Sequence, residues 1–161
     1  MDSGGAGRWR GGVGIVRDVR ILHDEVTLGV RMDNCKYPAY GVSGGRSGAP
    51  GAFIVNPGTP GERALKTMSD GHTLRKGDVL RVITPGGGGW GDPVERPAED
   101  VLGDVLDGFV SREVAEAAYG VVLTADGRSV DVAATSHRRA TAERPRAMFN
   151  RGRYFGAGDR L

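Results

Sequence analysis

Alternating apolar and polar positions in the first half of the chain predict β-strands. Between residues 13 and 23, β-branched residues alternate with charged ones, as on a half-buried strand. A second segment, residues 25–32, places four apolar side chains on one face: Val26, Leu28, Val30 and Met32. His23 and Asp24 lie between the two segments, so the pattern predicts a β-hairpin. Shorter strands are expected at residues 53–55 and 79–83.

After residue 93 the apolar positions change to a helical spacing. Pro97 suits the first turn of a helix, and the apolar stripe that follows consists of Val101, Leu102, Val105 and Leu106. Ser111 is a good N-cap for a second helix over residues 112–119, and Gly120 would end it. A short strand is expected at 121–123 and a third helix at 131–142. We therefore predict an α+β fold, in which a mostly antiparallel, β-rich portion precedes a small helical C-terminal portion.

These patterns divide the chain into three parts. Residues 1–93 form a glycine-rich β portion, residues 94–144 form a helical portion packed on it, and residues 145–161 form an extended basic tail. The tail holds large side chains that would be wasted in free solution, so we expect it to dock on the rest of the chain. These side chains are Met148, Phe149, Tyr154 and Phe155.

Glycine content changes this picture most. The 161 residues include 28 glycines, whereas a usual share of ~7% would give roughly 11. They gather in two runs, residues 2–12 and 84–93, and they also punctuate the irregular segment 33–51. A loop as long as 33–51 is usually functional or part of an interface. Consecutive glycines at 86–89 indicate that the backbone path itself matters, because they remove every Cβ from the turn.

Charge and cysteine content exclude several classes of protein. The net charge is only +2, and few aromatic residues accompany the basic residues after Ser136, so nucleic acid is not an expected partner. No apolar run approaches the ~20 residues of a membrane span, and no signal peptide opens the sequence. The lone Cys35 fits a reducing compartment. We therefore expect a cytoplasmic protein without a membrane partner.

Two local charge patterns have simple interpretations. Six acidic residues between Asp92 and Asp107 indicate a solvated face. Lys36 would lower the pKa of the neighbouring Cys35 thiol, although a packed or surface thiol is the simpler role for this residue.

The second glycine run allows several kinds of site. Gly86, Gly88 and Gly91 match G-x-G-x-x-G, but Pro93 and Pro97 delay the helix that a dinucleotide site needs. Close packing of backbone against backbone is the favoured interpretation, and a nest of N–H groups that binds an anion is the alternative. The three histidines have no paired metal-ligand spacing. No metal site and no catalytic residue are therefore predicted.

Four motifs resemble one protein family. They are Asp2-Ser-Gly-Gly-Ala-Gly-Arg-Trp-Arg-Gly-Gly12, Gly58-Thr-Pro-Gly-Glu62, Leu74-Arg-Lys-Gly-Asp-Val-Leu-Arg81 and Thr84-Pro-Gly-Gly-Gly-Gly-Trp-Gly-Asp-Pro93. In this order and spacing they resemble the C-terminal region of the hydantoinase B/oxoprolinase family, and residues 101–123 resemble its helical end. The resemblance covers residues 2 to about 135. Members of the family are several times longer, so the chain resembles a C-terminal fragment of a B-type subunit, or one product of a split gene.

The resemblance implies a reaction and partners. B-type subunits work with a larger, ATP-binding A-type subunit to open cyclic amides such as hydantoin or 5-oxoproline with ATP hydrolysis. Phosphorylation activates the amide, and the B-type subunit handles the activated intermediate. We accordingly expect this chain to bind no cofactor and to be inactive alone. It would join an oligomer with an A-type subunit and the N-terminal part of the B subunit, and this complete assembly would hold ATP and a divalent metal.

Two loops contain the candidate residues for substrate or anion binding. The first includes Ser3, Gly4, Gly5, Arg8 and Arg10, and the second includes Gly86, Gly87, Gly88, Gly89 and Asp92. Arg8 and Arg10 suit a phosphate or carboxylate because a guanidinium can donate two parallel hydrogen bonds. A structural salt bridge is the alternative role for these arginines. Two other functions stay open for the chain: a non-catalytic assembly module, or part of a subunit like those of acetone and acetophenone carboxylases.

Overall fold

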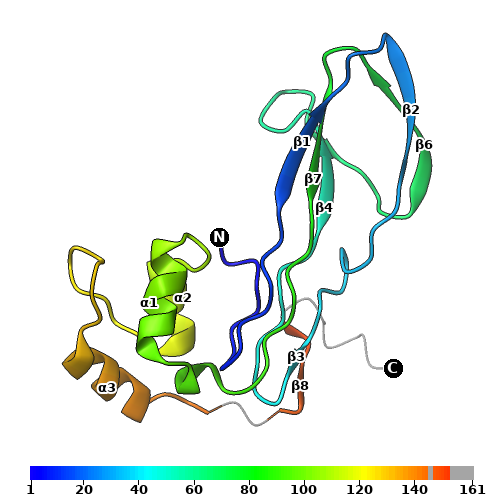
Figure 1. Cartoon of the computed structure of the whole chain (residues 1–161). Coiled ribbons are helices and arrows are strands. Elements are labelled where there is room, and N and C mark those ends of the chain that lie inside the picture. The colour runs from blue at the N-terminus through cyan, green and yellow to red at the C-terminus, as the bar shows by residue number, and fades with distance from the viewer. Residues whose placement is uncertain (145–146, 153–161) are drawn as a thin grey trace.

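The computed structural model describes residues 1–144 and 147–152. Strands come first and helices later, so the predicted α+β class is confirmed. The strands are β1 (Val16–Arg20), β2 (Glu25–Val30), β3 (Gly41–Val42), β4 (Ala52–Val55), β5 (Arg63–Ala64), β6 (Ser69–Arg75), β7 (Val79–Ile83) and β8 (Phe149–Asn150). The helices are the 3-10 helix η1 (Pro93–Glu95), α1 (Ala98–Leu106), α2 (Arg112–Tyr119) and α3 (Val132–Ala140). Figure 1 shows most strands at one end of an elongated molecule and the helices at the other.

The hairpin predicted for residues 13–32 is wrong. β1 pairs with β7 in a sheet of order β1-β7-β4-β5, whereas β2 pairs with β6 in a separate ribbon. The corner between β1 and β2 lies against the corner between β6 and β7, where Ile21 N–H donates to Asp78 O and Gly77 N–H donates to Ile21 O. β1 and β2 are therefore not paired with each other, and the backbone hydrogen bonds after β1 join it to the corner between β6 and β7. Residues 69–75 are mostly polar, which concealed β6 in the sequence.

A side-chain core joins the sheet to the β2-β6 ribbon. The apolar face predicted for residues 25–32 is confirmed, because Val30 is buried and Val26, Leu28 and Met32 pack around the same cluster. The buried members of this strand core are Val30, Phe53, Val55, Leu65, Leu74 and Leu80.

Local capping sets the bounds of α2 as predicted. The Ser111 side chain accepts a hydrogen bond from Val114 N–H, and Gly120 adopts a left-handed φ of 64°. α3 begins after Asp131, whose carboxylate accepts from Ala134 N–H. The strand expected at 121–123 is reduced to a single bridge.

A second core lies among the helices. It contains Val101, Ala115, Tyr119 and Val121, and it also contains Ala6 from the first glycine run. The helices therefore pack onto the glycine-rich segments. No helix in the described part of the chain has the length and apolar character needed to cross a bilayer.

The start of the C-terminal tail docks as expected. β8 pairs antiparallel with β3, and the Phe149 ring meets the Tyr40 ring edge-on at 5.4 Å between centroids. Met148 O accepts from Ser43 N–H at 2.8 Å. Tyr154 and Phe155 lie outside the described residues, and the three-part division of the chain stays a prediction.

Candidate functional site

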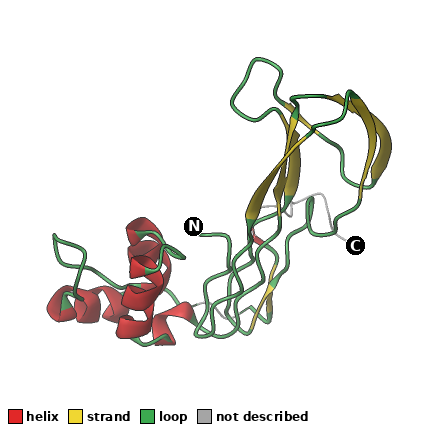
Figure 2. Cartoon of the chain, turned by 45° about the horizontal axis from the view of Figure 1, so that its top comes forward, coloured by secondary structure: helices red, strands yellow, loops and turns green. Residues whose placement is uncertain are grey.

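Both glycine runs and the 33–51 loop come together in one body. We call it the glycine lattice and define it as residues 3–14, 39–51 and 84–91. Figure 2 shows these segments as extended loops that run side by side between the helices and the larger strands. Most of the long loop predicted to be functional or interfacial, residues 39–51, is therefore part of this lattice.

Backbone hydrogen bonds connect each lattice segment to the other two. Gly5 N–H donates to Gly87 O at 2.8 Å, Arg46 N–H donates to Ala6 O at 2.7 Å, and Gly89 N–H donates to Arg46 O at 2.9 Å. Because these bonds satisfy polar groups that would otherwise be buried without partners, the segments can pack closely without forming a regular sheet.

Glycine is required here by close approach. A Cβ on Gly86 would overlap the carbonyl oxygen of Ser3, a Cβ on Gly88 would overlap that of Tyr40, and a Cβ on Gly89 would overlap that of Ala6. None of Gly86–Gly89 has a positive φ. The interpretation of the run as backbone packed against backbone is therefore confirmed. Gly87 lies more openly, since the nearest atom to its added Cβ is 3.1 Å away.

Most amides of the second run are already engaged. The N–H groups of Gly86, Gly87 and Gly89 donate to backbone oxygens at 3.0, 2.9 and 2.9 Å. An anion nest needs several N–H groups that converge on the ligand. Anion binding by this run stays a prediction, and it would require these bonds to be released.

The first loop is built into the lattice in the same way. Ser3 Oγ accepts from Gly14 N–H at 2.9 Å, and Ser3 O accepts from Ala49 N–H at 2.8 Å. A Cβ on Gly4 or Gly5 would overlap a backbone oxygen of another part of the lattice. These residues thus position the backbone, and their roles toward a ligand stay predictions.

Arg10 has a buried ionic partner that the sequence did not reveal. Its Nε lies 3.1 Å from Asp104 Oδ2, and Arg96 Nη2 lies 2.9 Å from the same oxygen. The Arg10 guanidinium also lies 5.1 Å from the centroid of the Phe109 ring. Asp104 is 7% exposed, so its assignment to a solvated acidic face is wrong. Arg10 has the structural salt bridge considered above, and it joins the lattice to α1.

Tyr119 lies beside this cluster and is fully buried. Burial raises the pKa of Tyr119 to about 12, partly opposed by the charges of Arg96 and Arg10. The phenol is therefore neutral at physiological pH and serves as part of the helical core.

Arg8 differs from Arg10 in exposure. Its side chain is 53% exposed, and its Nη1 lies 3.8 Å from a Glu95 carboxylate that is equally exposed. A surface pair at this distance contributes little to stability. Arg8 is thus the more accessible of the two predicted arginines.

Asp92 connects the second run to the helices. One carboxylate oxygen accepts from Val94 N–H at 2.9 Å and caps η1. The other lies 2.8 Å from Arg144 Nη1. The structure thus brings the first loop and residues 86–89 together within the lattice, whereas Asp92 lies at the junction with the helical end.

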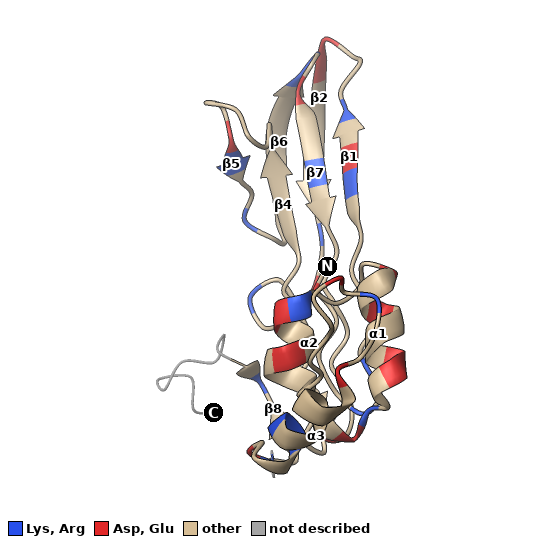
Figure 3. Ribbon diagram, turned by 90° about the vertical axis from the view of Figure 1, so that its left-hand side faces the viewer, with Lys and Arg blue, Asp and Glu red and all other residues tan. Residues whose placement is uncertain are grey.

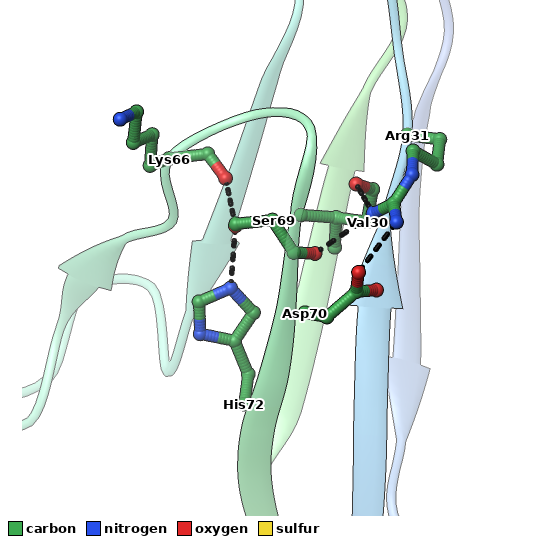
Figure 4. Close-up of polar contacts among 6 residues, drawn as sticks. All are labelled: Val30, Arg31, Lys66, Ser69, Asp70 and His72. Atoms are coloured by element: carbon green, nitrogen blue, oxygen red, sulfur yellow. Dashed lines mark hydrogen bonds and ion pairs between the residues drawn. The ribbon is translucent and has the colours of Figure 1, made fainter.

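A Ser–His contact in β6 was not anticipated. Ser69 Oγ lies 2.6 Å from His72 Nε2 and also bonds to Lys66 O. Such a pair can form part of a nucleophilic site when a third group orients the histidine. Figure 4 shows instead that Asp70 points to Arg31, at 2.5 Å. The contact lies beside an irregularity in the β2-β6 pairing, where it supports the backbone.

Cys35 is not activated. Its Sγ donates to the carbonyl oxygens of Met32 and Asp33. Burial and the Asp33 charge raise the pKa of the thiol, so the lowering expected from Lys36 is wrong. Lys36 Nζ lies over the Tyr37 ring at 4.6 Å.

The described residues offer no cluster of metal-binding groups. In residues 1–144 and 147–152, no three His, Cys, Asp or Glu side chains come together as a candidate metal site.

Comparison with known proteins then decides the family. The sequence profile of hydantoinase B/oxoprolinase matches residues 1–93, a segment that contains the whole glycine lattice. The chain belongs to the hydantoinase B/oxoprolinase family. The resemblance seen in the four motifs is thus confirmed.

Individual relatives extend this match beyond the lattice. The caprolactamase subunit beta of Pseudomonas jessenii is 32% identical over 142 residues, which are 86% of this chain and 24% of that protein. A 5-oxoprolinase of Saccharomyces cerevisiae is 34% identical over 91 residues, 55% of this chain and 7% of that protein. The chain therefore spans about a quarter or less of the length of these relatives.

Solved structures share the fold. The crystal structure of the ATP-dependent caprolactamase from Pseudomonas jessenii matches with a TM-score of 0.72 and 33% identity, over 87% of this chain and 24% of that one. A nucleotide-free acetone carboxylase matches with a TM-score of 0.60 and 24% identity, over 87% of this chain and 23% of that one.

Proposed function

We propose that the chain is the C-terminal part of a B-type subunit that acts in the ATP-dependent hydrolysis of a cyclic amide, such as hydantoin or 5-oxoproline. The observation that carries this proposal is the match to the caprolactamase chain. It covers 87% of this chain at a TM-score of 0.72, so it includes parts of both the lattice and the helical end.

Within that subunit the chain acts as a scaffold. Its glycine amides are engaged within the lattice, and Arg10 and Asp92 are held in ion pairs. We assign ATP and the divalent metal to an A-type subunit and to the N-terminal part of the B subunit, in a cytoplasmic oligomer. This assignment is supported by residues 1–144 and 147–152, in which no three His, Cys, Asp or Glu side chains come together.

Arg8 is the residue that we propose for contact with an anionic group of the substrate or of the A-type subunit. It is half exposed, and its ion pair with Glu95 is long at 3.8 Å. A guanidinium in this state can donate two parallel hydrogen bonds to a carboxylate or phosphate.

A chimeric caprolactamase tests the function. The 142 matched residues of subunit beta are replaced by the corresponding part of this chain, and ATP-dependent lactam hydrolysis is measured with the alpha subunit present. We expect activity in the chimera and none from the 161-residue chain alone with hydantoin or 5-oxoproline. An inactive but folded chimera, or turnover by the isolated chain, would contradict the proposal.

A carboxylase subunit is the second candidate. The acetone carboxylase structure shares the fold at a TM-score of 0.60, but at only 24% identity, so we rank it below the hydrolase. An equivalent chimera of acetone carboxylase tests this candidate. If it incorporates labelled bicarbonate into acetone with ATP, and the caprolactamase chimera hydrolyses no lactam, the order of the two candidates is reversed.

A further inference from the structure

Both tryptophans of the chain are exposed on the glycine lattice. Trp9 is 63% exposed and Trp90 is 50% exposed. They lie opposite each other, since Trp9 N–H donates to Trp90 O at 3.0 Å and Trp90 N–H donates to Trp9 O at 2.9 Å. Tryptophan is highly buried on average in folded proteins, so two exposed tryptophans at one place indicate a binding surface.

These tryptophans belong to a longer row across four backbone segments. Trp9 pairs with Trp90, Trp90 pairs with Val42, and Val42 pairs with Phe149 in β8. Residues that lie opposite on paired segments present their side chains on the same face. We call these four residues the aromatic row, and the Tyr40 ring extends it through its contact with Phe149.

Two chain neighbours of the row, Arg10 and Gly89, face the interior. Arg10, next to Trp9, reaches the buried Asp104. Gly89, next to Trp90, packs against Ala6 O. The row thus lies on an outer surface of the lattice, where Phe149 and the adjoining Tyr40 are also each 55% exposed.

We propose that the aromatic row is the surface on which the remaining part of a hydantoinase B-type chain docks. This inference rests on the proposed function, and two observations select the occupant. The family profile covers Trp9, Val42 and Trp90 within residues 1–93, so the row lies in the part shared with longer relatives. The matched region is only 24% of the caprolactamase chain, which leaves three-quarters of such a subunit to cover it.

The composition of the row fits a protein interface. Tryptophan and tyrosine are enriched among the residues that carry most binding energy, and contiguous exposed apolar side chains mark contact sites. β1 offers a contrast, because its exposed Val16 and Val19 are interspersed with the charged residues Arg17, Asp18 and Arg20. Charges of this kind protect sheet edges from pairing, and Figure 3 shows both signs on β1.

Association in trans tests the docking surface. The tagged 161-residue chain is co-expressed with caprolactamase subunit beta that lacks its 142 matched residues, so that the two can fold together. We expect the two polypeptides to co-purify. In oxidative footprinting read by mass spectrometry, modification of Trp9 and Trp90 should fall at least fivefold relative to the chain alone, whereas modification of the distant Leu22 should not change.

Variants give a second readout. Trp9→Ala combined with Trp90→Ala should reduce the co-purified partner at least tenfold, and the control Leu22→Ala, at a residue 77% exposed, should leave it unchanged. Thermal melts establish that the variants fold, and the footprint of the wild-type chain needs no variant.

Three results would overturn the docking proposal. They are a complex in which both tryptophans stay fully reactive, two soluble polypeptides that do not associate, and protection of the tryptophans in the isolated chain through dimerisation. The last result would assign the row to a second copy. None depends on turnover, so an active chimera together with unprotected tryptophans would reject the docking surface while keeping the proposed function.

Discussion

The glycine lattice and the strand core are packed by opposite means. In the strand core, buried side chains such as Phe53 and Leu74 fill the space between a sheet and a ribbon. In the lattice, carbonyl oxygens lie where Cβ atoms would be, and the backbone is the packing material. Removing side-chain atoms damages the first region, whereas adding a single carbon damages the second. A segment with the composition of a loop can therefore be a closely packed part of a fold.

The largest expected effect is that of Gly88→Ala. The new Cβ would overlap Tyr40 O, so a lattice segment must move, and we expect a loss of about 3 kcal/mol or more in the free energy of unfolding. Gly12→Ala is the matched control, because no atom lies within 4 Å of its added Cβ, and it should cost no more than about 0.5 kcal/mol. Urea denaturation measures both. Equal stabilities for the two variants would show that the lattice backbone accommodates an added Cβ at little cost in free energy.

Asp104→Asn tests the link between the lattice and the helical end. The change leaves the guanidinium groups of Arg10 and Arg96 without their shared carboxylate, and breaking a buried ion pair is expected to cost about 3 kcal/mol. Asp107→Asn, at an exposed residue of the same helix end, should change stability by less than about 0.5 kcal/mol. If the Asp104 variant melts like the wild type, the cluster does not hold the two regions together.

The smallest effect concerns an exposed ion pair on the sheet. Arg81 donates two hydrogen bonds to Asp18, both at 2.8 Å, and this bonding holds the pKa of Asp18 below its ordinary value of 3.8. Because the folded-state pKa is lowered, any stability from this pair is present above the unfolded pKa and is lost as pH falls through the folded value. Carboxyl NMR titration should show the low pKa.

Two variants complete this titration. Arg81→Gln should return the pKa of Asp18 toward its ordinary value, whereas Arg17→Gln should change it little, because Arg17 makes no hydrogen bond to Asp18 in the described structure. An unchanged pKa in the Arg81 variant would show that the pair does not persist in solution.

Prediction from the sequence succeeded where local chemistry decides the structure. The Ser111 cap and the Gly120 stop act within a few residues, so both ends of α2 were correct. The hairpin prediction was wrong because strand pairing is non-local. β1 and β2 both have the alternation of a strand, but β1 pairs with β7 and β2 pairs with β6. The polar β6 gave no apolar alternation that could have signalled this pairing.

The candidate site divides in the same way. Glycine at 86–89 signalled a close approach, because no other residue lacks a Cβ, but the approaching atoms belong to Ser3, Tyr40 and Ala6, which no local rule selects. Arg10 and Arg8 have the same side chain and nearly the same position in the sequence. Arg10 is buried against Asp104 and has a structural role, whereas Arg8 is exposed and accessible.

The sequence by itself determined the α+β class, the helix caps, the need for a backbone without side chains at two runs, and membership of the hydantoinase B/oxoprolinase family. These properties depend on residue type and on short spacing. Tertiary structure alone decided that three distant segments form one lattice, that Arg10 and Arg96 share Asp104, and that Trp9, Trp90, Val42 and Phe149 line up on one face. The physical reason is that these contacts join residues up to more than a hundred positions apart. Such contacts are selected by the path of the whole chain and by the need to satisfy its hydrogen bonds. Patterns among neighbouring residues do not specify them.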